Sequence, residues 1–272
     1  MKSTENKIAI LGSGNIGMAL AKGLVKAKYC KASQITLTRR NLRHLTELTE
    51  QGYQVTDQNI SAVKEASVII LAVLPQQFNQ LLQQIKKAID PKKHLIISVV
   101  SGVSCQDIAN QLGDQIPIIR AMPNTAISIG QSMTCFASDN ASPKHIKIVT
   151  ELFETVGSVM KINEELMISA TALCACGIAF FLRAIRAASQ GGIEIGFHAS
   201  EALHMAAQTA KGAADLLLQL HNHPEHEIDK VTSPNGCTIA GLNEMEHHGF
   251  SSSLIKGIKL SATRAGGLYV KE

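Results

Sequence analysis

The chain has 272 residues, of which 45% are hydrophobic and 18% are charged, a balance that supports two modest domains with buried cores and excludes a disordered chain. Its net charge is +4 and its pI about 8.7. Lysine and arginine are spread thinly without interleaved aromatic residues, which argues against a nucleic-acid partner and suits a small anionic ligand.

The sequence shows no segment typical of export or membrane insertion. The first residues, MKSTENKIAILGSG, lack the apolar stretch and cleavage site of a signal peptide. No run approaches the roughly 18 apolar residues of a membrane span. The six cysteines have no framework spacing, as expected of reduced thiols. We therefore predict a cytoplasmic protein without a membrane partner.

The first predicted strand, 7–11, runs directly into a glycine-rich turn that opens a helix. In this G-x-G-x-x-G pattern Gly12 permits a tight turn, Gly14 lets the backbone approach a pyrophosphate, and Gly17 allows close packing of helix on strand. The helix start offers unpaired N–H groups to the phosphates. The pattern favours a dinucleotide site over a glycine turn without a ligand.

The second predicted strand, 35–38, ends at Thr38-Arg39-Arg40. An NAD site wants a carboxylate there for the ribose hydroxyls, whereas guanidinium groups and a hydroxyl suit a 2′-phosphate. Because the acid is absent and the bases are present, we predict NADP, with NADPH preferred over NADH.

Further apolar runs alternate with helical patterns, which is typical of βαβ units in a parallel-rich sheet covered on both faces. These additional strands are predicted at 66–73, 94–100, 116–122 and 133–138. We predict an α/β, Rossmann-type domain over residues 1–163.

From about residue 164 the strand pattern stops, and an all-α domain is predicted over 164–272. Helical spacing covers 164–190, 198–221, 238–248 and 252–268. A Rossmann domain needs a second domain to close its substrate cleft, and we expect the helical domain to have that role.

Two groups of side chains raise the question of a metal. His221, His223 and His226 fall in a predicted polar loop between helices, which supplies no ordered shell of converging ligands. Cys174 and Cys176 lie two apart in a helix, where they face different directions. We predict no metal site and interpret both cysteines as small buried thiols.

The stretch TSPNGCTIAGL (232–242) is uncharged and rich in hydroxyls. The spacing of Ser, Cys, His, Asp and Glu along the chain indicates no nucleophilic triad. An enzyme that transfers a hydride needs none, because its nicotinamide cofactor carries the chemistry. For a C=N acceptor that is already protonated, one nearby hydroxyl donor suffices.

Segments along nearly the whole chain resemble, in the right order, the pyrroline-5-carboxylate reductase family. VTSPNGCTIAGLNEME (231–246) is similar to the family's V-T-S-P-G-G-T-T-x-x-x-L-x-x-L-E. LAVLPQ (71–76) resembles A-V-K-P-Q, and RAMPNT (120–125) matches R-x-M-P-N-T. TALCACGIAF (171–180) resembles T-A-L-S-G-S-G-P-A-Y.

This resemblance implies NADPH-dependent reduction of 1-pyrroline-5-carboxylate, a five-membered cyclic imine, to L-proline in the last step of proline biosynthesis. It also implies that the C-terminal domain forms a homodimer with a shared active site, and in some members a higher ring such as a decamer. The implied cofactor contacts are Gly12, Gly14, Asn15, Ile16, Gly17, Thr38, Arg39, Asn59, Ala72, Val73, Pro75, Met122, Pro123 and Asn124. The implied substrate contacts are Ser233, Asn235, Gly236, Cys237, Thr238 and Cys176, with the Thr238 hydroxyl nearest the imine nitrogen.

The sequence departs from the family pattern at several of these positions. Asn235 and Cys237 replace Gly and Thr in the turn, and Cys174, Cys176 and Ile178 replace Ser, Ser and Pro, which makes the predicted pocket more apolar. Two alternatives therefore stay open: a reductase of a different cyclic imine, and an NADP-binding paralogue without catalysis.

Overall fold

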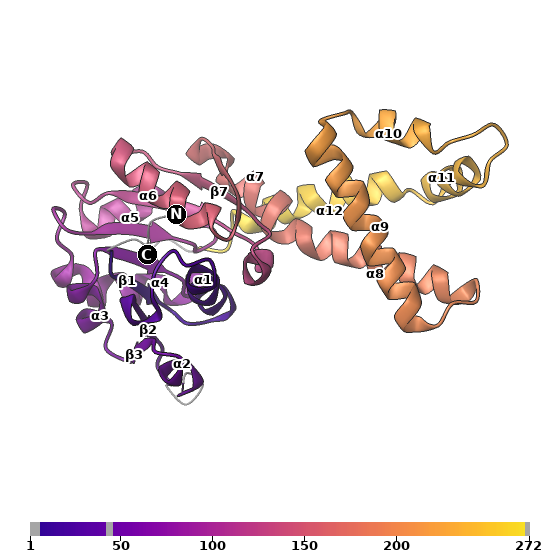
Figure 1. Cartoon of the computed structure of the whole chain (residues 1–272). Coiled ribbons are helices and arrows are strands. Elements are labelled where there is room, and N and C mark those ends of the chain that lie inside the picture. Colours follow the sequence, from indigo (N-terminus) through magenta and orange to yellow (C-terminus); the bar gives the residue numbers. More distant parts are fainter. Residues whose placement is uncertain (1–5, 42–45, 270–272) are drawn as a thin grey trace. The chain divides into compact units, whose positions relative to one another are not determined.

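The computed structural model describes residues 6–41 and 46–269 (Figure 1). The chain forms two compact units. One holds the chain up to Cys176 together with the segment from Ser261 onward, and the other is Gly177–Leu260. The boundary between the two compact units thus lies after Cys176, whereas the predicted strands end before about residue 164. The assignment of a nucleotide-binding domain to 1–163 and a dimerisation domain to 164–272 stays a prediction.

The first unit is built on an eight-stranded sheet with the order β3-β2-β1-β4-β5-β6-β7-β8. All neighbouring strands are parallel except β6 and β7. The strands are β1 (Ile8–Leu11), β2 (Ile35–Thr38), β3 (Gln54–Thr56), β4 (Val68–Leu71), β5 (Leu95–Ser98), β6 (Ile118–Met122), β7 (Ser132–Ala137) and β8 (Gly157–Lys161). Since β2 and β4 lie on opposite sides of β1, the chain reverses its direction of winding there, and such a switch point is where ligands bind in open α/β sheets.

Alternate residues of the strands feed two separate cores, one on each face of the sheet. Ile8 and Ile10 belong to the core under α1, α2 and α6, whereas Ala9 and Leu11 belong to the core under α3, α4 and α5. A sheet covered on both faces explains why the central strands β1 and β4 are apolar throughout. The α-helices of this unit are α1 (Asn15–Lys26), α2 (Thr46–Glu50), α3 (Asn59–Glu65), α4 (Pro75–Ile85), α5 (Cys105–Leu112), α6 (Pro143–Glu154) and α7 (Met167–Ala170). Short 3-10 turns are η1 (Ala32–Gln34), η3 (Lys86–Ala88), η4 (Thr125–Ile129) and η5 (Glu164–Leu166), and η6 (Thr171–Cys176) is a π-helix.

The predicted α/β fold followed by a helical region is confirmed, and all six predicted strands are present. The sequence reading missed β3 and β8. β3 has only three residues and contains a single strongly apolar side chain, Val55. β8 lies at the sheet edge, and its half-exposed residues gave no continuous apolar run.

The segment after α12 returns to the first unit. Gly102 has a φ of +83°, and a Cβ added there would stand 3.2 Å from the Ala265 carbonyl oxygen and 3.3 Å from the Tyr269 nitrogen. The Tyr269 hydroxyl donates to Asn79 Oδ1 at 2.6 Å, and its ring lies edge-on to Phe78 of α4. The segment 266–269 is therefore built into the sheet unit.

The second unit consists of helices. They are α8 (Gly177–Glu194), α9 (Ala199–Leu220), α10 (Pro224–Lys230), α11 (Cys237–His247) and α12 (Phe250–Ala265), the last of which ends in the first unit. The predicted loop over 221–227 is wrong in its second half, because α10 begins at Pro224. Pro is favoured at the first position of a helix, and His223 caps the helix by accepting a hydrogen bond from the Glu225 N–H at Nδ1.

One helical segment among the described residues, Glu164–Glu194, is long and apolar enough to cross a membrane by length and composition. The prediction that no stretch approaches such a span is wrong on this point. Ser169 and Thr171 interrupt the apolar run without adding charge, so counting uninterrupted apolar residues underestimated the segment. Core and interface helices of soluble proteins pass the same test, and this segment also carries Arg183 and Arg186.

Candidate active site

A cleft of about 1000 Å³ opens at the carboxyl ends of β1, β2 and β4, where the switch point predicts a ligand. Nine of the predicted cofactor residues line it. They are Gly12, Gly14, Asn15, Ile16, Thr38, Arg39, Asn59, Ala72 and Val73. The structure thus brings together segments that are far apart in the sequence, all within the first unit.

The glycine turn has the shape that a pyrophosphate requires. Gly12 has a φ of +104°, and a Cβ there would stand 2.5 Å from the Ala72 carbonyl oxygen. A Cβ at Gly17 would stand 2.3 Å from the Gly12 oxygen, whereas one at Gly14 would meet nothing within 4 Å. No side chain caps the start of α1 at Gly14, so its first N–H groups are available to an anion. The turn therefore fits the phosphates of a dinucleotide.

The end of β2 is fastened to this turn by hydrogen bonds. Ser13 donates from both its backbone nitrogen and its Oγ to the Thr38 carbonyl oxygen, each at 3.0 Å. Arg39 Nη1 donates to the Ser13 carbonyl oxygen at 3.3 Å. This contact holds the Arg39 guanidinium at the cleft beside the glycine turn, and Arg40 also lines the cleft. A held Arg39 guanidinium and the nearby exposed Arg40 place two positive charges at this strand end, which suits a 2′-phosphate.

The opposite wall of the cleft was not predicted. Gln77, Gln80 and Gln84 of α4 face the cleft, and Gln84 Oε1 accepts a hydrogen bond from Asn59 Nδ2 at 2.9 Å. Their spacing of three and four residues is a polar stripe along one side of an amphipathic helix, and this signal is readable in the sequence. Asp57 also lines the cleft and follows β3; it was missed because β3 was missed.

The other five predicted cofactor residues lie outside the lining of the cleft. Gly17 packs under the turn and Pro75 begins α4, while Met122 and Pro123 are buried at the end of β6. Asn124 uses its side chain within the protein: Oδ1 accepts from the Ala126 N–H at 3.0 Å, and Nδ2 donates to the Cys174 carbonyl oxygen at 3.3 Å. Direct cofactor contacts from these five residues stay a prediction.

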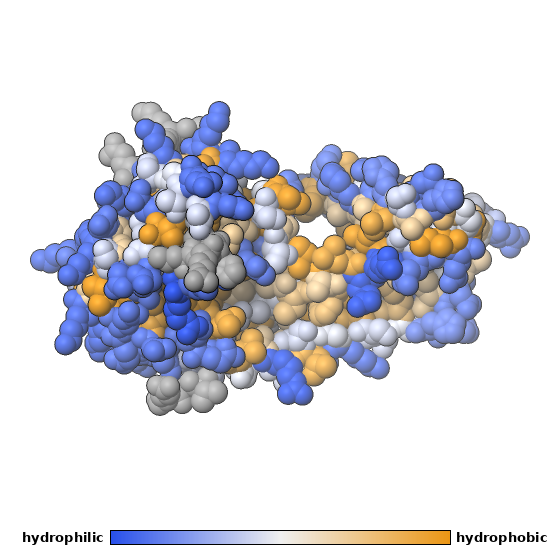
Figure 2. All heavy atoms as spheres, turned by 90° about the horizontal axis from the view of Figure 1, so that it is seen from below, coloured by the Kyte–Doolittle hydropathy of each residue, from blue (hydrophilic) through white to orange (hydrophobic). Residues whose placement is uncertain are grey.

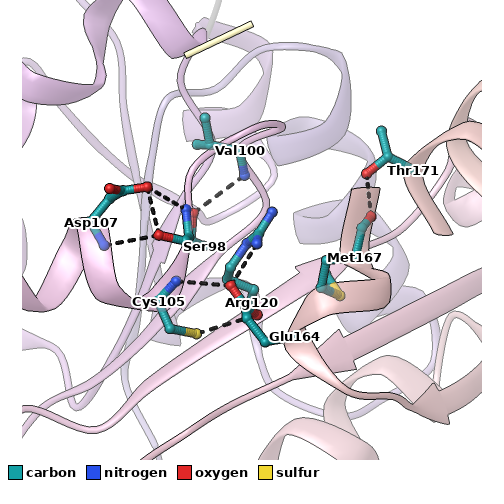
Figure 3. A network of polar contacts seen from close by, with 9 residues as sticks. Ser98, Val100, Cys105, Asp107, Arg120, Glu164, Met167 and Thr171 are labelled. Carbon is teal, nitrogen blue, oxygen red and sulfur yellow. Dashed lines mark hydrogen bonds and ion pairs between the residues drawn. The ribbon is translucent and has the colours of Figure 1, made fainter. Parts of the chain in front are cut away.

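A buried ion pair holds β6 to the segment that leads into η6 (Figure 3). Arg120 Nη1 lies 2.6 Å from Glu164 Oε1, and the two side chains are only 5% and 19% exposed. The backbone N–H of Cys105, the first residue of α5, donates to the same carboxylate oxygen at 3.0 Å. Farther along the segment the Thr171 hydroxyl donates to the Met167 carbonyl oxygen at 2.7 Å. Arg120 of the RAMPNT segment is therefore a structural anchor.

The π-helix η6 contains the two cysteines of the TALCAC segment. Both are half-buried rather than buried as predicted. Cys174 Sγ lies 3.9 Å from Cys135 Sγ of β7. The hydrogen bond with Cys135 lowers the pKa of Cys174 to about 7, while the same contact, and then burial, raise the pKa of Cys135. Within residues 6–41 and 46–269 no cluster of three His, Cys, Asp or Glu side chains is placed to hold a metal ion.

The predicted substrate turn lies in the second unit and opens α11. The Gly236 N–H donates to the Ser233 carbonyl oxygen at 3.0 Å, and Asn235 has a φ of +55°. This is a type II arrangement with Pro at its second position, and Asn is among the few side chains that accept a positive φ at its third. The structure thus explains Asn235 in the place of the family's glycine.

Gly236 is the N-cap of α11, and no side chain caps the helix. A Cβ at Gly236 would stand 2.9 Å from the Ser233 carbonyl oxygen, which cannot rotate away as a side chain can, so the close turn favours glycine here. Cys237 and Thr238 are the first two residues of α11, and Thr238 is half-buried. The uncapped N–H groups at the start of this eleven-residue helix are a suitable site for a carboxylate.

The sheet, its switch point and the glycine turn together define a dinucleotide-binding protein of the Rossmann class. Two family models match the chain: "NADP oxidoreductase coenzyme F420-dependent" over residues 7–102, and "Pyrroline-5-carboxylate reductase dimerisation" over residues 164–268. The chain is 47% identical to pyrroline-5-carboxylate reductase 2 of Dictyostelium discoideum, with 97% of the chain and 93% of that relative aligned. The chain belongs to the pyrroline-5-carboxylate reductase family.

Two further proteins are similar to the chain, one in sequence and one in fold. Pyrroline-5-carboxylate reductase 1 of Dictyostelium discoideum is 52% identical over the whole chain, although the chain spans about half of that protein's length (51%). The crystal structure of Plasmodium falciparum pyrroline carboxylate reductase with NADP bound has the same fold, with a TM-score of 0.91 at 22% identity, covering 99% of this chain and 100% of that one.

Proposed function

We propose that this chain reduces 1-pyrroline-5-carboxylate to L-proline with NADPH, as the last step of proline biosynthesis. The observation that carries the proposal is the cleft at the glycine turn, in which Gly14 leaves open space and the start of α1 is uncapped. The shape and charge of this cleft suit a dinucleotide phosphate, and the family supplies the reaction class.

When bound, the reduced nicotinamide supplies the hydride that adds to the imine carbon. The chain's own groups bind and orient. The Gly12–Gly17 turn holds the pyrophosphate, and the start of α11 holds the substrate carboxylate through its free N–H groups. The Thr238 hydroxyl lies at the imine nitrogen, where its oxygen accepts a hydrogen bond from the N–H of the protonated imine as the carbon accepts the hydride.

A steady-state assay tests this function directly. NADPH absorbance should fall when 1-pyrroline-5-carboxylate is added, and L-proline should accumulate in equal amount. Thr238→Val, which removes the hydroxyl at nearly constant volume, should lower kcat by roughly 10²–10⁴-fold, whereas Thr232→Val in the same turn is the matched control. Turnover of a six-membered imine alone would favour the different-imine alternative, and NADPH binding by calorimetry without any turnover would favour the silent paralogue.

The preference for NADPH over NADH is assigned to Arg39 and Arg40. Charge-assisted hydrogen bonds are worth about 1.5–3 kcal/mol, so Arg39→Ala should raise the Kd for NADPH by roughly 10–100-fold and change the Kd for NADH far less. Equal weakening for both cofactors would show instead that Arg39 acts by holding the Ser13 backbone.

We also propose a homodimer formed by the second unit. Residues 177–260, all of which are described, contribute nothing to the three hydrophobic cores. Phe181 and Leu182 of α8, Leu218 of α9 and Leu260 of α12 are each more than half exposed. Figure 2 shows this apolar surface, in orange and tan, over the helical unit. Such an area needs a partner surface, and a second copy supplies a complementary one.

The solution mass tests the assembly. With 29.1 kDa per chain, light scattering distinguishes monomer, dimer and a ring such as a decamer assembled from dimers. A cytoplasmic location is proposed because all six cysteines are free, as is usual in a reducing compartment.

A further inference from the structure

Two of the six cysteines touch each other. The sulfur atoms of Cys135 and Cys174 are 3.9 Å apart although the residues are 39 positions apart in the chain. Cys135 lies in β7 with 4% of its surface exposed, and Cys174 lies in η6 and is half-buried. A disulfide requires about 2.05 Å between the sulfur atoms, so the two must approach by about 1.9 Å. Because both are side-chain ends, rotation about the Cα–Cβ bonds supplies movement of this order.

We propose that Cys135 and Cys174 form a reversible intramolecular disulfide when the protein meets a small hydroperoxide, so that this pair is an oxidation site of the chain. The proposal is independent of the reductase activity, since it concerns residues in contact within the first unit. Neither residue was assigned a role by the cofactor cleft or the substrate turn.

The two cysteines have different parts in the reaction. Cys174 is the attacking group, because it is the more accessible of the two and because its contact with Cys135 favours the Cys174 thiolate. Its sulfur bonds to one peroxide oxygen, the O–O bond breaks, and the second oxygen leaves and takes up a proton as water or alcohol. Cys174 is then a sulfenic acid.

Cys135 completes the reaction as the resolving thiol. Its sulfur attacks the Cys174 sulfur, the S–S bond forms, and the S–O bond breaks. The departing hydroxide takes the Cys135 proton and leaves as water. Two thiols are thereby oxidised to one disulfide and one peroxide bond is reduced. Cys135 is only 4% exposed and pairs with Met122 of the neighbouring strand, so a small uncharged oxidant suits this place.

The position of the pair gives the bond a structural consequence. At present η6 is held to the loop after β6 by the hydrogen bond from Asn124 Nδ2 to the Cys174 carbonyl oxygen. A disulfide would add a covalent link from the same residue to β7. The π-helix would then be fixed in its register, and π-segments are frequent at functional sites.

The test uses the full chain, fully reduced and then freed of reductant. After a titrated dose of hydrogen peroxide, the intact mass should fall by two hydrogen atoms. Peptide mapping should show Cys135 linked to Cys174, and dithiothreitol should restore both thiols. A mass gain of oxygen atoms without this link in the wild-type chain would overturn the proposal, as would a link that joins any other pair.

Single-residue variants test which cysteine attacks the peroxide and which one resolves the sulfenic acid. In Cys135→Ser the sulfenic acid should persist on Cys174 and be trapped by dimedone, whereas Cys174→Ser should lose both the link and the dimedone adduct at this site. Cys176→Ser, two residues farther along η6, is the matched control and should keep the link. Burial raises the pKa of Cys30 to about 11 and that of Cys105 to about 12, so both thiols should remain free. The wild-type peptide map decides the matter even if a variant fails to fold.

Discussion

Two glycines of the cofactor turn are needed for different reasons: Gly17 for close packing within the protein, and Gly14 for close approach of the pyrophosphate. Replacing each with alanine distinguishes a loss of stability from a loss of NADPH binding. At Gly17 the new methyl group would lie 2.3 Å from the Gly12 carbonyl oxygen and 3.1 Å from Ile10 Cγ2. Alanine gains about 1 kcal/mol of helix propensity, but overpacking against a backbone atom this close costs about 2–3 kcal/mol, the upper part of the usual range. The carbonyl cannot rotate away, because it belongs to the turn. We therefore expect Gly17→Ala to lower the free energy of unfolding by about 1–2 kcal/mol.

At Gly14 the same change meets nothing within 4 Å, and its φ of −80° suits any residue. Alanine is a poorer N-cap than glycine but reduces the entropy of the unfolded chain by a similar amount. Stability should therefore stay within about 0.5 kcal/mol of the wild type, while the methyl group stands where a pyrophosphate would approach and weakens NADPH binding. Urea unfolding and a fluorescence titration with NADPH measure the two effects. Equal stability of Gly17→Ala and wild type, or unchanged NADPH affinity of Gly14→Ala, would refute the reasoning.

Three further predictions concern stability. Arg120→Met should lower the free energy of unfolding by about 3 kcal/mol, because it leaves the Glu164 carboxylate without its cation; a loss below 1 kcal/mol in urea unfolding would contradict this. Asn235→Ala should cost about 0.5–1 kcal/mol because its φ is +55°, whereas Asn235→Gly should be nearly neutral, and thermal melts compare the two. His94 is buried, accepts a hydrogen bond from the Asp90 N–H, and has its pKa lowered below 6.5, first by burial. The unfolded state then binds more protons as the pH falls below about 6.5, so stability should be lost there. His94→Gln should reduce the difference in unfolding free energy between pH 7.5 and 5.5, and an unchanged difference would refute this assignment.

The parts of the fold that could be predicted are those in which local pattern and burial agree. β1, β4 and β5 are buried on both faces and read as continuous apolar runs. β3 and β8 could not be predicted, because their pairing with β2 and β7 depends on contacts that no local pattern encodes. The same limit applies to Asp57, which follows a missed strand.

The candidate site shows the same contrast. Gly12, Gly14 and Arg39 could be placed from their spacing after predicted strands, and they line the cleft. The internal hydrogen bonds of Asn124 could not be foreseen, since its partner Cys174 lies fifty residues away. The π-helical register of η6 was also hidden, because TALCAC has the same apolar spacing as an ordinary helix.

The return of the C-terminal segment to the sheet unit bears on how the protein is made. Ala265 and Tyr269 pack against Gly102 and α4, so the helical unit is an insertion within the first one. A ribosome therefore releases the sheet, then the helices, and only after them the segment that packs beside α4. Domains that emerge first usually fold first, but here the nucleotide unit stays incomplete until the segment from Ser261 to Tyr269 has been made. A premature stop before residue 261 would damage the unit that begins the chain.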